Sequence, residues 1–405
     1  MLFCSPIAGL LRLRCEDATP RAEVRQAAAG DDSCSVRHVR ERVLTTADLN
    51  RALLARQLLL ERSKLPLTRA LERVGGIQAQ YAPSSYIALW SRLERFALSD
   101  LNRALERRRA VQGTLLRSTI HLVSASDYWP FAVGSRSGRR DSWLRFEKKR
   151  LGPVDMDERA ALVRSALAGR VLHRDKLLEL LRQHDPTGGT LAWNALSAWI
   201  DLVRAPPSGT WERRRADLYA LAEDWLGPPD VTHELSVELL LRRYLGGFGP
   251  ARLADVASWA GLPVGELQPV AERVRLRRFR DEEGRELLDL ARAPLPGGEA
   301  PAPVRFLPTW DATLLAHARR TQILPERFRS LVFDTKTPHS TPTFLVDGAV
   351  AGTWDVERSR KEATITLEPF ERLPAGARRE LREEAERLVR VMEPDAESHV
   401  VAGAG

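Results

Sequence analysis

The stretch "GGIQAQYAPSSYIALWSRL", residues 75–93, places a glycine pair and two glutamines between two segments with helical spacing. The segment before it, "LTRALERV" (67–74), predicts a helix that ends at Gly75 or Gly76, because glycine readily adopts the left-handed backbone of a helix C-cap. The segment after it, "PSSYIALWSRLERF" (83–96), predicts a second helix. The glutamines therefore fall in a short break that is predicted to be extended chain.

The segments on either side complete a winged-helix pattern over residues 43–150. "TTADLNRALLARQLLLERS" (45–63) predicts a helix with Thr45 or Thr46 as its N-cap, and Ser84 or Ser85 is the expected N-cap of the helix at 83–96. "SDLNRALERRR" (99–109) predicts a fourth helix, and "VQGTLLRSTIHLVS" (111–124) is strand-like. Helices followed by a hairpin of this size predict a helix-turn-helix with a β-wing.

A comparable order recurs in two later blocks, of which the one at 231–292 predicts a helix-turn-helix with a wing and the one at 151–230 matches the pattern less closely. The second unit, over 151–230, has predicted helices at 173–184 and 190–204 and then the loop "APPSGTW". The third unit, over 231–292, has three predicted helices, at 233–249, 252–262 and 264–274, followed by strands at 275–281 and 285–291. Residues 1–42 lack sustained periodicity and are predicted to be a disordered N-terminal extension.

The last part of the chain is expected to be rich in β-structure. The Pro/Gly run "APLPGGEAPAPV" (293–304) is interpreted as a linker. In the region 305–405, strands are predicted at 330–334, 343–356 and 362–370, and a closing amphipathic helix at 375–392. The predicted fold class is therefore α+β, mainly helical with β-wings, plus a C-terminal β-rich region.

The charge balance makes nucleic acid a reasonable partner. The chain has 62 Lys and Arg against 54 Asp and Glu, a formal net charge of +8, and only six of the basic residues are lysine. The planar guanidinium suits bidentate contacts to phosphate, although GC-rich codons alone also produce an arginine-rich chain. The most suggestive basic cluster spans 136–150, where DNA contacts are predicted for Arg136, Arg139, Arg140 and Trp143. The alternative for such clusters is a solvated helix face.

Other classes of protein are disfavoured by the motifs. All three cysteines, Cys4, Cys15 and Cys34, precede the predicted domains, so neither a disulfide framework nor a cysteine metal site is expected there. The sequence has no P-loop, no dinucleotide-binding glycine motif and no histidine pair at metal-ligand spacing. We therefore expect no metal, no cofactor and no nucleotide. No membrane span or signal peptide is predicted, and the expected compartment is the cytoplasm.

Gln78 and Gln80 are the central candidates for chemistry. In extended chain alternate side chains lie on the same side, which places both amides together. Two such amides can hold one water, because each offers a donor and an acceptor, but neither can act as a strong base. The alternative is a pair of turn amides that bond to the backbone.

Two further groups of polar residues are candidates for supporting roles. In "LLRSTIHLV" (115–123), Arg117, Thr119 and His121 are expected to share one face of a strand, although a solvated strand face explains them as well. "FLPTWDATLLAHARRTQ" (306–322) gathers four predicted DNA contacts, of which the aspartate is equally suited to cap a helix. These four are Trp310, Asp311, His317 and Arg320.

Several of these blocks together resemble a known family. "LNRALLARQLLL", "GGIQAQYAPSSYIALWSRL", "LLRSTIHLVSASDYWPF", "LLRRYLGGFGPARLADVASWAGL" and "LPTWDATLLAHARR" followed by "TFLVDGAVAGTW" occur in the order found in the AlkZ- and YcaQ-like superfamily of winged-helix bacterial DNA glycosylases. The resemblance covers roughly residues 45–360. It implies three winged-helix units in a C shape around duplex DNA, completed by the C-terminal region. It also implies a catalytic Gln-x-Gln motif, here Gln78, Ala79 and Gln80.

The resemblance implies a DNA repair enzyme that acts on alkylated duplex DNA. AlkZ-like members excise bulky N7-alkylpurines, unhook interstrand crosslinks and often protect the producer of a genotoxic natural product. We expect a monomeric, monofunctional glycosylase in which two glutamines position water and Arg117, Thr119 and His121 support the site. Two alternatives stay open: a winged-helix transcription regulator, and a catalytically silent family member that binds damaged DNA or another ligand.

Overall fold

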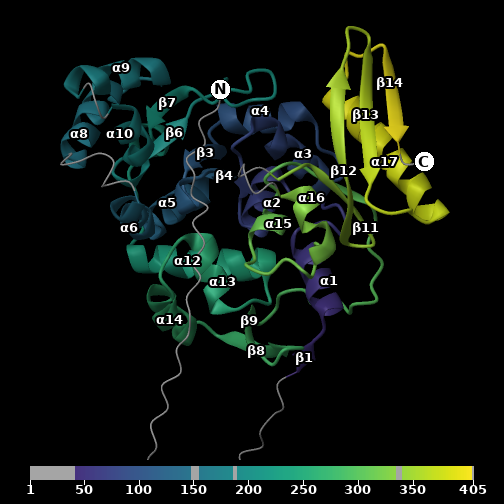
Figure 1. The fold of residues 1–405 in the computed structure, drawn as a ribbon. Helices are drawn as coiled ribbons and strands as arrows, with labels where there is room; N and C mark the ends of the chain where they lie inside the picture. The colour runs from purple at the N-terminus through teal and green to yellow at the C-terminus, as the bar shows by residue number, and fades with distance from the viewer. Residues whose placement is uncertain (1–41, 147–154, 186–188, 334–339, 404–405) are drawn as a thin grey trace, which may run out of the picture.

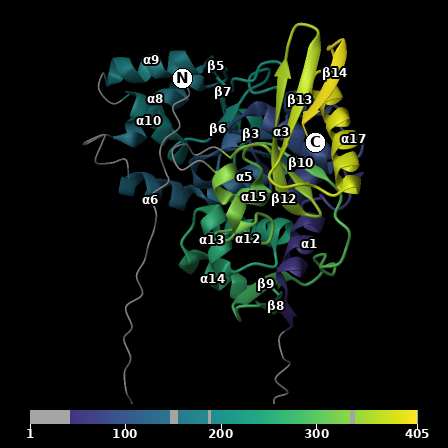
Figure 2. The same cartoon turned by 45° about the vertical axis from the view of Figure 1, so that its right-hand side comes forward.

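The structure, a computed structural model, describes residues 42–146, 155–185, 189–333 and 340–403. It combines helices with three separate sheets, which confirms the predicted α+β class (Figure 1). The predicted N-terminal extension lies, apart from its last residue, outside the described residues. In Figures 1 and 2 the C-terminal sheet and its helix lie on one side of the molecule. The helices α8 (Met156–Leu167), α9 (Arg174–His184) and α10 (Gly189–Ala195) lie on the opposite side.

The first helices form where the sequence predicts them, but one begins elsewhere. Thr45 caps the first helix, and its side chain and Asp48 form a reciprocal capping box. Gly75 ends the second helix with φ 78°, as predicted. The predicted serine caps are wrong, because Ser84 and Ser85 are buried inside the third helix. The four helices are α1 (Thr46–Arg56), α2 (Leu67–Val74), α3 (Ala82–Arg92) and α4 (Leu98–Glu106).

A six-stranded antiparallel sheet joins the predicted first and second units. Its order is β2-β4-β3-β6-β7-β5, and the β3–β6 pairing crosses the predicted boundary between the units. The two parts of the chain therefore share one sheet. The strands are β2 (Ile77–Gln78), β3 (Ala110–Thr114), β4 (Ile120–Ser124), β5 (Leu172–His173), β6 (Leu202–Arg204) and β7 (Leu218–Leu221).

The segment predicted as a helix at 190–204 is helical only in its first half. It continues through a short 3-10 turn, Leu196–Ala198, and its last residues form β6 in the central sheet. Apolar spacing alone does not separate a buried strand from a buried helix here. The helices around this part of the sheet are α5 (Ala125–Gly134), α6 (Arg136–Phe146), α8 (Met156–Leu167), α9 (Arg174–His184), α10 (Gly189–Ala195) and α11 (Ala222–Leu226).

The third block has three helices followed by an antiparallel hairpin, as predicted. The helices are α12 (His233–Phe248), α13 (Leu253–Ala260) and α14 (Val264–Arg273). The hairpin strands are β8 (Leu276–Asp281) and β9 (Glu286–Leu290), and β1 (Val43–Leu44) adds a parallel strand beside β8. The start of the described chain is thus tied to the third block.

The C-terminal region is a five-stranded sheet with a long helix. The predicted β-structure at 343–356 and 362–370 and the closing helix are confirmed, although the first stretch is divided into two strands by a turn at Asp347 and Gly348. The strand predicted at 330–334 is wrong, because Arg329–Val332 forms the helix α16. The sheet has the order β10-β11-β12-β13-β14, of which only β13–β14 is parallel. Its elements are β10 (Arg305–Leu307), α15 (Ala312–Leu315), β11 (Thr343–Val346), β12 (Ala349–Arg358), β13 (Glu362–Pro369), α17 (Ala375–Met392) and β14 (Ser398–Gly403).

The predicted linker at 293–304 is irregular in structure but is held against α1. Arg51 and Arg56 donate hydrogen bonds to Ala300 O (2.5 Å) and Pro294 O (3.0 Å). Gly298 N–H donates to Asp48 at 3.0 Å. The segment therefore belongs to the packed body of the protein.

A buried ion pair joins the first helices to the C-terminal region. Both terminal guanidinium nitrogens of Arg92 bind Asp311, at 3.0 and 2.9 Å, and the two side chains are 2% and 1% exposed. Arg92 also donates to Gln57 (3.2 Å), whose amide nitrogen donates to Val74 O at 3.1 Å and Gly247 O at 2.9 Å. One polar network thus fixes the end of α2, directly before the glutamine segment.

Replacing Asp311 by alanine leaves the Arg92 guanidinium buried without its carboxylate. We expect Asp311→Ala to lower the free energy of unfolding by about 3–5 kcal/mol, the usual cost of breaking a buried pair. The matched control is Glu371→Ala, which removes the exposed partner of Arg327 and is expected to cost less than about 1 kcal/mol. Urea unfolding followed by circular dichroism measures both variants, and equal losses would contradict the assignment.

Candidate active site

The two-residue strand β2 places Gln78 directly opposite His121 of β4. The pairing continues for one residue, since Ala79 N–H donates to Ile120 O at 2.8 Å. Side chains of directly opposed residues lie on the same face of a sheet and close together. Gln78 and His121 are 6% and 3% exposed. The prediction of extended chain around Gln78 is thus confirmed, and its amide shares a buried face with an imidazole.

The surroundings of His121 keep its imidazole neutral. Its Nδ1 lies 3.0 Å from Thr119 O and 3.5 Å from Thr119 Oγ1. A carbonyl oxygen only accepts hydrogen bonds, so Nδ1 carries the proton and Nε2 keeps its lone pair. Burial, helped by the nearby charge of Arg117, lowers the pKa of His121 to about 3. At neutral pH the ring is therefore an uncharged hydrogen-bonding group.

Gln80 lies in the bend between β2 and α3 and is half-buried. Its Oε1 atom is buried and has no hydrogen-bond partner among the described residues. An unpaired buried acceptor costs about 1–3 kcal/mol, so such an atom needs an explanation. A bound water or a substrate group would satisfy it. The prediction that both amides point to the same side stays a prediction, because the bend ends the strand before Gln80.

Arg117 does not share a strand face with Thr119 and His121, so that prediction is wrong. Residues 115–119 form a tight turn in which Arg117 and Ser118 adopt left-handed backbone, with φ 51° and 58°. Left-handed backbone costs roughly 1–3 kcal/mol per non-glycine residue and concentrates at functional sites. The Arg117 guanidinium donates to Trp259 O, and burial lowers its pKa to about 10, so it stays charged at neutral pH.

The turn at 115–119 is held between α6 and α13. A side chain at Gly138 of α6 would place its Cβ 1.8 Å from Gly261 O, so only glycine allows this approach. Gly261, which ends α13, in turn packs on Arg117. Close packing on both sides explains how the strained turn persists. We refer to Gln78, Gln80, Arg117, Thr119 and His121 as the glutamine site.

The predicted DNA-contacting residues of α6 face the second part of the chain. Arg136 binds Asp201 at 2.5 Å, and Arg140 donates to Ala198 O at 2.9 Å. Arg139 is buried and donates to two backbone carbonyls. Trp143 packs edge-on against Trp199, with ring centres 5.0 Å apart. Their DNA contacts stay predictions. The contacts of Arg136, Arg140 and Trp143 join α6 to residues 198–201, whereas the two carbonyls bound by Arg139 belong to the preceding segment.

The second predicted group, at 310–320, is also largely internal. Asp311 caps α15 and is paired with Arg92, which fits the capping alternative. Trp310 is buried, and the Arg320 guanidinium lies 4.5 Å from the Phe333 ring centre. His317 is buried beside Tyr244, and burial lowers the pKa of its imidazole. The structure therefore gives Asp311 a structural role, and the DNA contacts expected of this group stay predictions.

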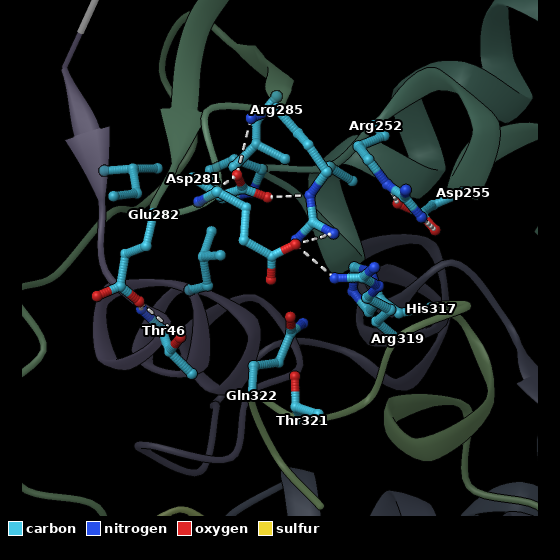
Figure 3. A pocket seen from close by; sticks show the side chains of 16 residues that line it. Thr46, Arg252, Asp255, Asp281, Glu282, Arg285, His317, Arg319, Thr321 and Gln322 are labelled. Atoms are coloured by element: carbon cyan, nitrogen blue, oxygen red, sulfur yellow. Dashed lines mark hydrogen bonds and ion pairs between the residues drawn. The ribbon is translucent and has the colours of Figure 1, made fainter. Parts of the chain in front are cut away.

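A charged pocket lies beside His317 and does not include the glutamine site (Figure 3). It is formed by α1, the start of α13, the β8–β9 turn and the segment after α15. Its charges are paired with one another: Arg285 binds Asp281 at 2.7 Å, and Arg319 binds Glu283 at 2.5 Å. The aromatic rings of Tyr244, Phe248 and Trp259 separate His317 from Arg117.

A run of exposed arginines beside Tyr81, the residue that follows Gln80, was not predicted from the sequence. Arg213, Arg214 and Arg215 lie in the loop between β6 and β7, and Arg214 donates to Tyr81 Oη at 3.2 Å. Tyr81 follows Gln80 directly and is 42% exposed. The sequence feature that could have indicated it is the run Arg213–Arg215, which follows Trp211 and Glu212 between two short apolar segments.

The described residues contain no group of three or more His, Cys, Asp and Glu side chains arranged to hold a metal ion. Within the same part of the chain, none of the helices has the length and apolar character needed to cross a membrane.

Comparison with known proteins identifies the family. Residues 71–391, more than half of the 405-residue chain, match the family model described as DNA glycosylase AlkZ-like. The DNA glycosylase AlkZ of Streptomyces sahachiroi has a similar fold, with a TM-score of 0.72 at 21% sequence identity. The similarity covers 89% of this chain and 100% of that one. No curated protein sequence matches. The chain therefore belongs to the AlkZ-like family of DNA glycosylases.

Proposed function

We propose that this protein hydrolyses the N-glycosidic bond of N7-alkylated purines in duplex DNA and that Gln78 and Gln80 position the attacking water. The observation that carries the proposal is the grouping of uncharged polar atoms at the glutamine site. The Gln78 amide lies opposite a neutral imidazole, and the buried Gln80 Oε1 has no partner among the described residues. Membership of a DNA glycosylase family supplies the reaction class and the DNA substrate.

The chemistry suits a site without a strong base. Alkylation at N7 leaves guanine cationic, so the C1′–N9 bond breaks with its electron pair going to N9 and the base leaves as a neutral molecule. The sugar then carries oxocarbenium character, and water adds to C1′ and loses a proton to solvent. A correctly placed water and carbonyl dipoles directed at the developing positive charge lower this barrier. Amide side chains supply both.

The other polar groups of the site have distinct roles in the proposal. His121, held by Thr119, offers its Nε2 lone pair as a hydrogen-bond acceptor without adding positive charge. Arg117 stays protonated and is held by Trp259 O, which suits it to a nearby backbone phosphate. The strained turn at 115–119 fixes both residues relative to β2.

The proposal extends to bulky N7-alkylguanine adducts and to unhooking of interstrand crosslinks, as the family resemblance implies. All these lesions contain the same cationic purine, so the same leaving group serves each. We further propose that the enzyme is monofunctional and monomeric and that it contributes to repair or to self-resistance against a genotoxic natural product. Amide side chains are not nucleophilic amines, so the two glutamines support hydrolysis by water rather than attack by a covalently attached amine.

The structure argues against the alternative of a sequence-reading regulator. In a helix-turn-helix protein the second helix of the pair reads bases in the major groove. Here all residues of α3 are buried, so it presents no reading surface. The exposed polar residues of α14 include Glu272 and Gln268 beside Arg273, which gives that helix no basic face. The other alternative, a catalytically silent member, is weakened by the presence of both glutamines.

Removing either amide should slow base release without unfolding the protein. We expect Gln78→Ala and Gln80→Ala each to reduce the rate by roughly 10²- to 10³-fold, or about 3–4 kcal/mol, as for the loss of one preorganised polar group. The assay is single-turnover release of 7-methylguanine from a duplex, followed by alkaline cleavage at the abasic site. Gln268→Ala, an exposed amide of α14, is the matched control. Activity at the wild-type level in both variants would refute the assignment.

The rate should not depend on pH across the neutral range. Glutamine does not ionise, the alkylated base is permanently cationic, and His121 gains a proton only near its pKa of about 3. Single-turnover release is therefore expected to be constant between about pH 6 and pH 8, with losses beginning only at much lower pH. The measurement is a pH–rate profile at saturating enzyme. A rise through an apparent pKa of 6–7 would instead identify a titrating base.

A further inference from the structure

The loop between β6 and β7, residues 205–217, is built as a fixed platform. Ser208 Oγ donates to Arg215 O at 3.0 Å and accepts hydrogen bonds from the backbone N–H groups of Asp217 and Leu218. Gln112 of the central sheet donates to Gly209 O at 3.0 Å. These contacts fix the two ends of the loop to each other and Gly209 to the central sheet. The exposed side chains of the loop therefore have a defined position.

The platform carries three successive arginines, which differ in how far their charge is balanced by a neighbouring carboxylate. Arg213 and Arg215 share the buried carboxylate of Asp217, at 2.9 and 3.9 Å. For Arg214, no ion pair is found within the described residues. Its guanidinium donates to Tyr81 Oη (3.2 Å) and lies 5.6 Å from the Trp211 ring centre. It is therefore an oriented cation whose charge is not neutralised by a carboxylate.

The platform is connected to the glutamine site through Tyr81. Tyr81 is the residue after Gln80, and Arg214 donates a hydrogen bond to its hydroxyl, so the arginine contacts the residue next to the proposed catalytic motif. Trp211 packs edge-on against Tyr86 of α3 at 5.5 Å, which fixes the same helix that follows the motif. Exposed arginines supported by aromatic rings are the side chains that bind a phosphate backbone.

We propose that the platform formed by Tyr81, Trp211 and Arg213–Arg215 binds the phosphate backbone of duplex DNA beside the lesion, with Arg214 as the principal contact. This inference rests on the proposed function, because it locates the duplex relative to the glutamine site. A phosphate bound at Arg214 fixes the neighbouring sugar near Gln80. Asp217 limits the contribution of Arg213 and Arg215, since their charge is already partly balanced.

The test compares Arg214→Gln with Arg379→Gln, the same change at an exposed arginine of α17. Binding of an undamaged duplex is followed by fluorescence anisotropy between 50 and 200 mM NaCl. Each lost phosphate contact reduces the slope of log K against log[salt] by about 0.9. The affinity deficit of Arg214→Gln relative to wild type should therefore shrink about 3.5-fold over this range, whereas Arg379→Gln should keep the wild-type slope.

Two outcomes would overturn the inference: a wild-type slope in Arg214→Gln, or equal changes in the two variants, which would report net charge alone. Thermal unfolding of both variants checks that the fold is intact. Base release from an alkylated duplex is assayed separately on the wild-type protein. Failure to release base with a reduced slope in Arg214→Gln would contradict the proposed function and leave the platform supported. Base release by the wild-type protein with an unchanged slope in Arg214→Gln would support the proposed function and contradict the platform.

Discussion

The pairing of β2 with β4 is the constraint on which the glutamine site depends. β2 is only two residues long, yet its register sets Gln78 against His121 and leads Ala79 into a hydrogen bond with Ile120. A shift of one residue would turn Gln78 to the other face of the sheet. The glycines before β2 enforce this register from outside the strand, because Gly75 and Gly76 lie against α12, α13 and β4 with little room for side chains.

Several arginines of this protein are buried and bind carboxylates and backbone carbonyls in the interior. Arg56 binds Asp289 and also donates to Leu245 O and Pro294 O, while Arg139 spans two carbonyls and Arg92 binds Asp311 and Gln57. A guanidinium has five donors in a rigid plane, so one side chain can join several segments that are distant in sequence. High arginine content is therefore an ambiguous sign of DNA binding here. Exposed arginines on a fixed loop, such as Arg214, are a more specific one.

Much of the helical structure could be predicted because its signals are local. The capping box of Thr45 and Asp48, the left-handed Gly75 and the apolar spacing of α12 and α17 are each contained in a few residues. The failures depend on distant contacts. The end of the segment at 190–204 forms a strand because β3 and β7 lie beside it. Arg117 leaves the predicted strand because α6 and α13 hold a tight turn there.

The same distinction applies to the site residues. The extended chain at Gln78 follows from its position after a helix stop, whereas the pairing with His121 requires the fold. Nothing in "ERRRAD" (212–217) shows that these arginines lie beside Tyr81, more than a hundred residues earlier. Conversely, "RSGRR" (136–140) has the composition of a DNA-binding surface, but Gly138 packs on α13 and Arg139 is buried.

The most direct measurement is a crystal structure of the protein bound to a duplex that contains a cationic azasugar in place of the lesion nucleotide, together with free 7-methylguanine. We predict one ordered water about 2.7–3.2 Å from the amides of both Gln78 and Gln80, on the face of the sugar opposite the base. A sugar bound away from β2, or a carboxylate in place of that water, would contradict it.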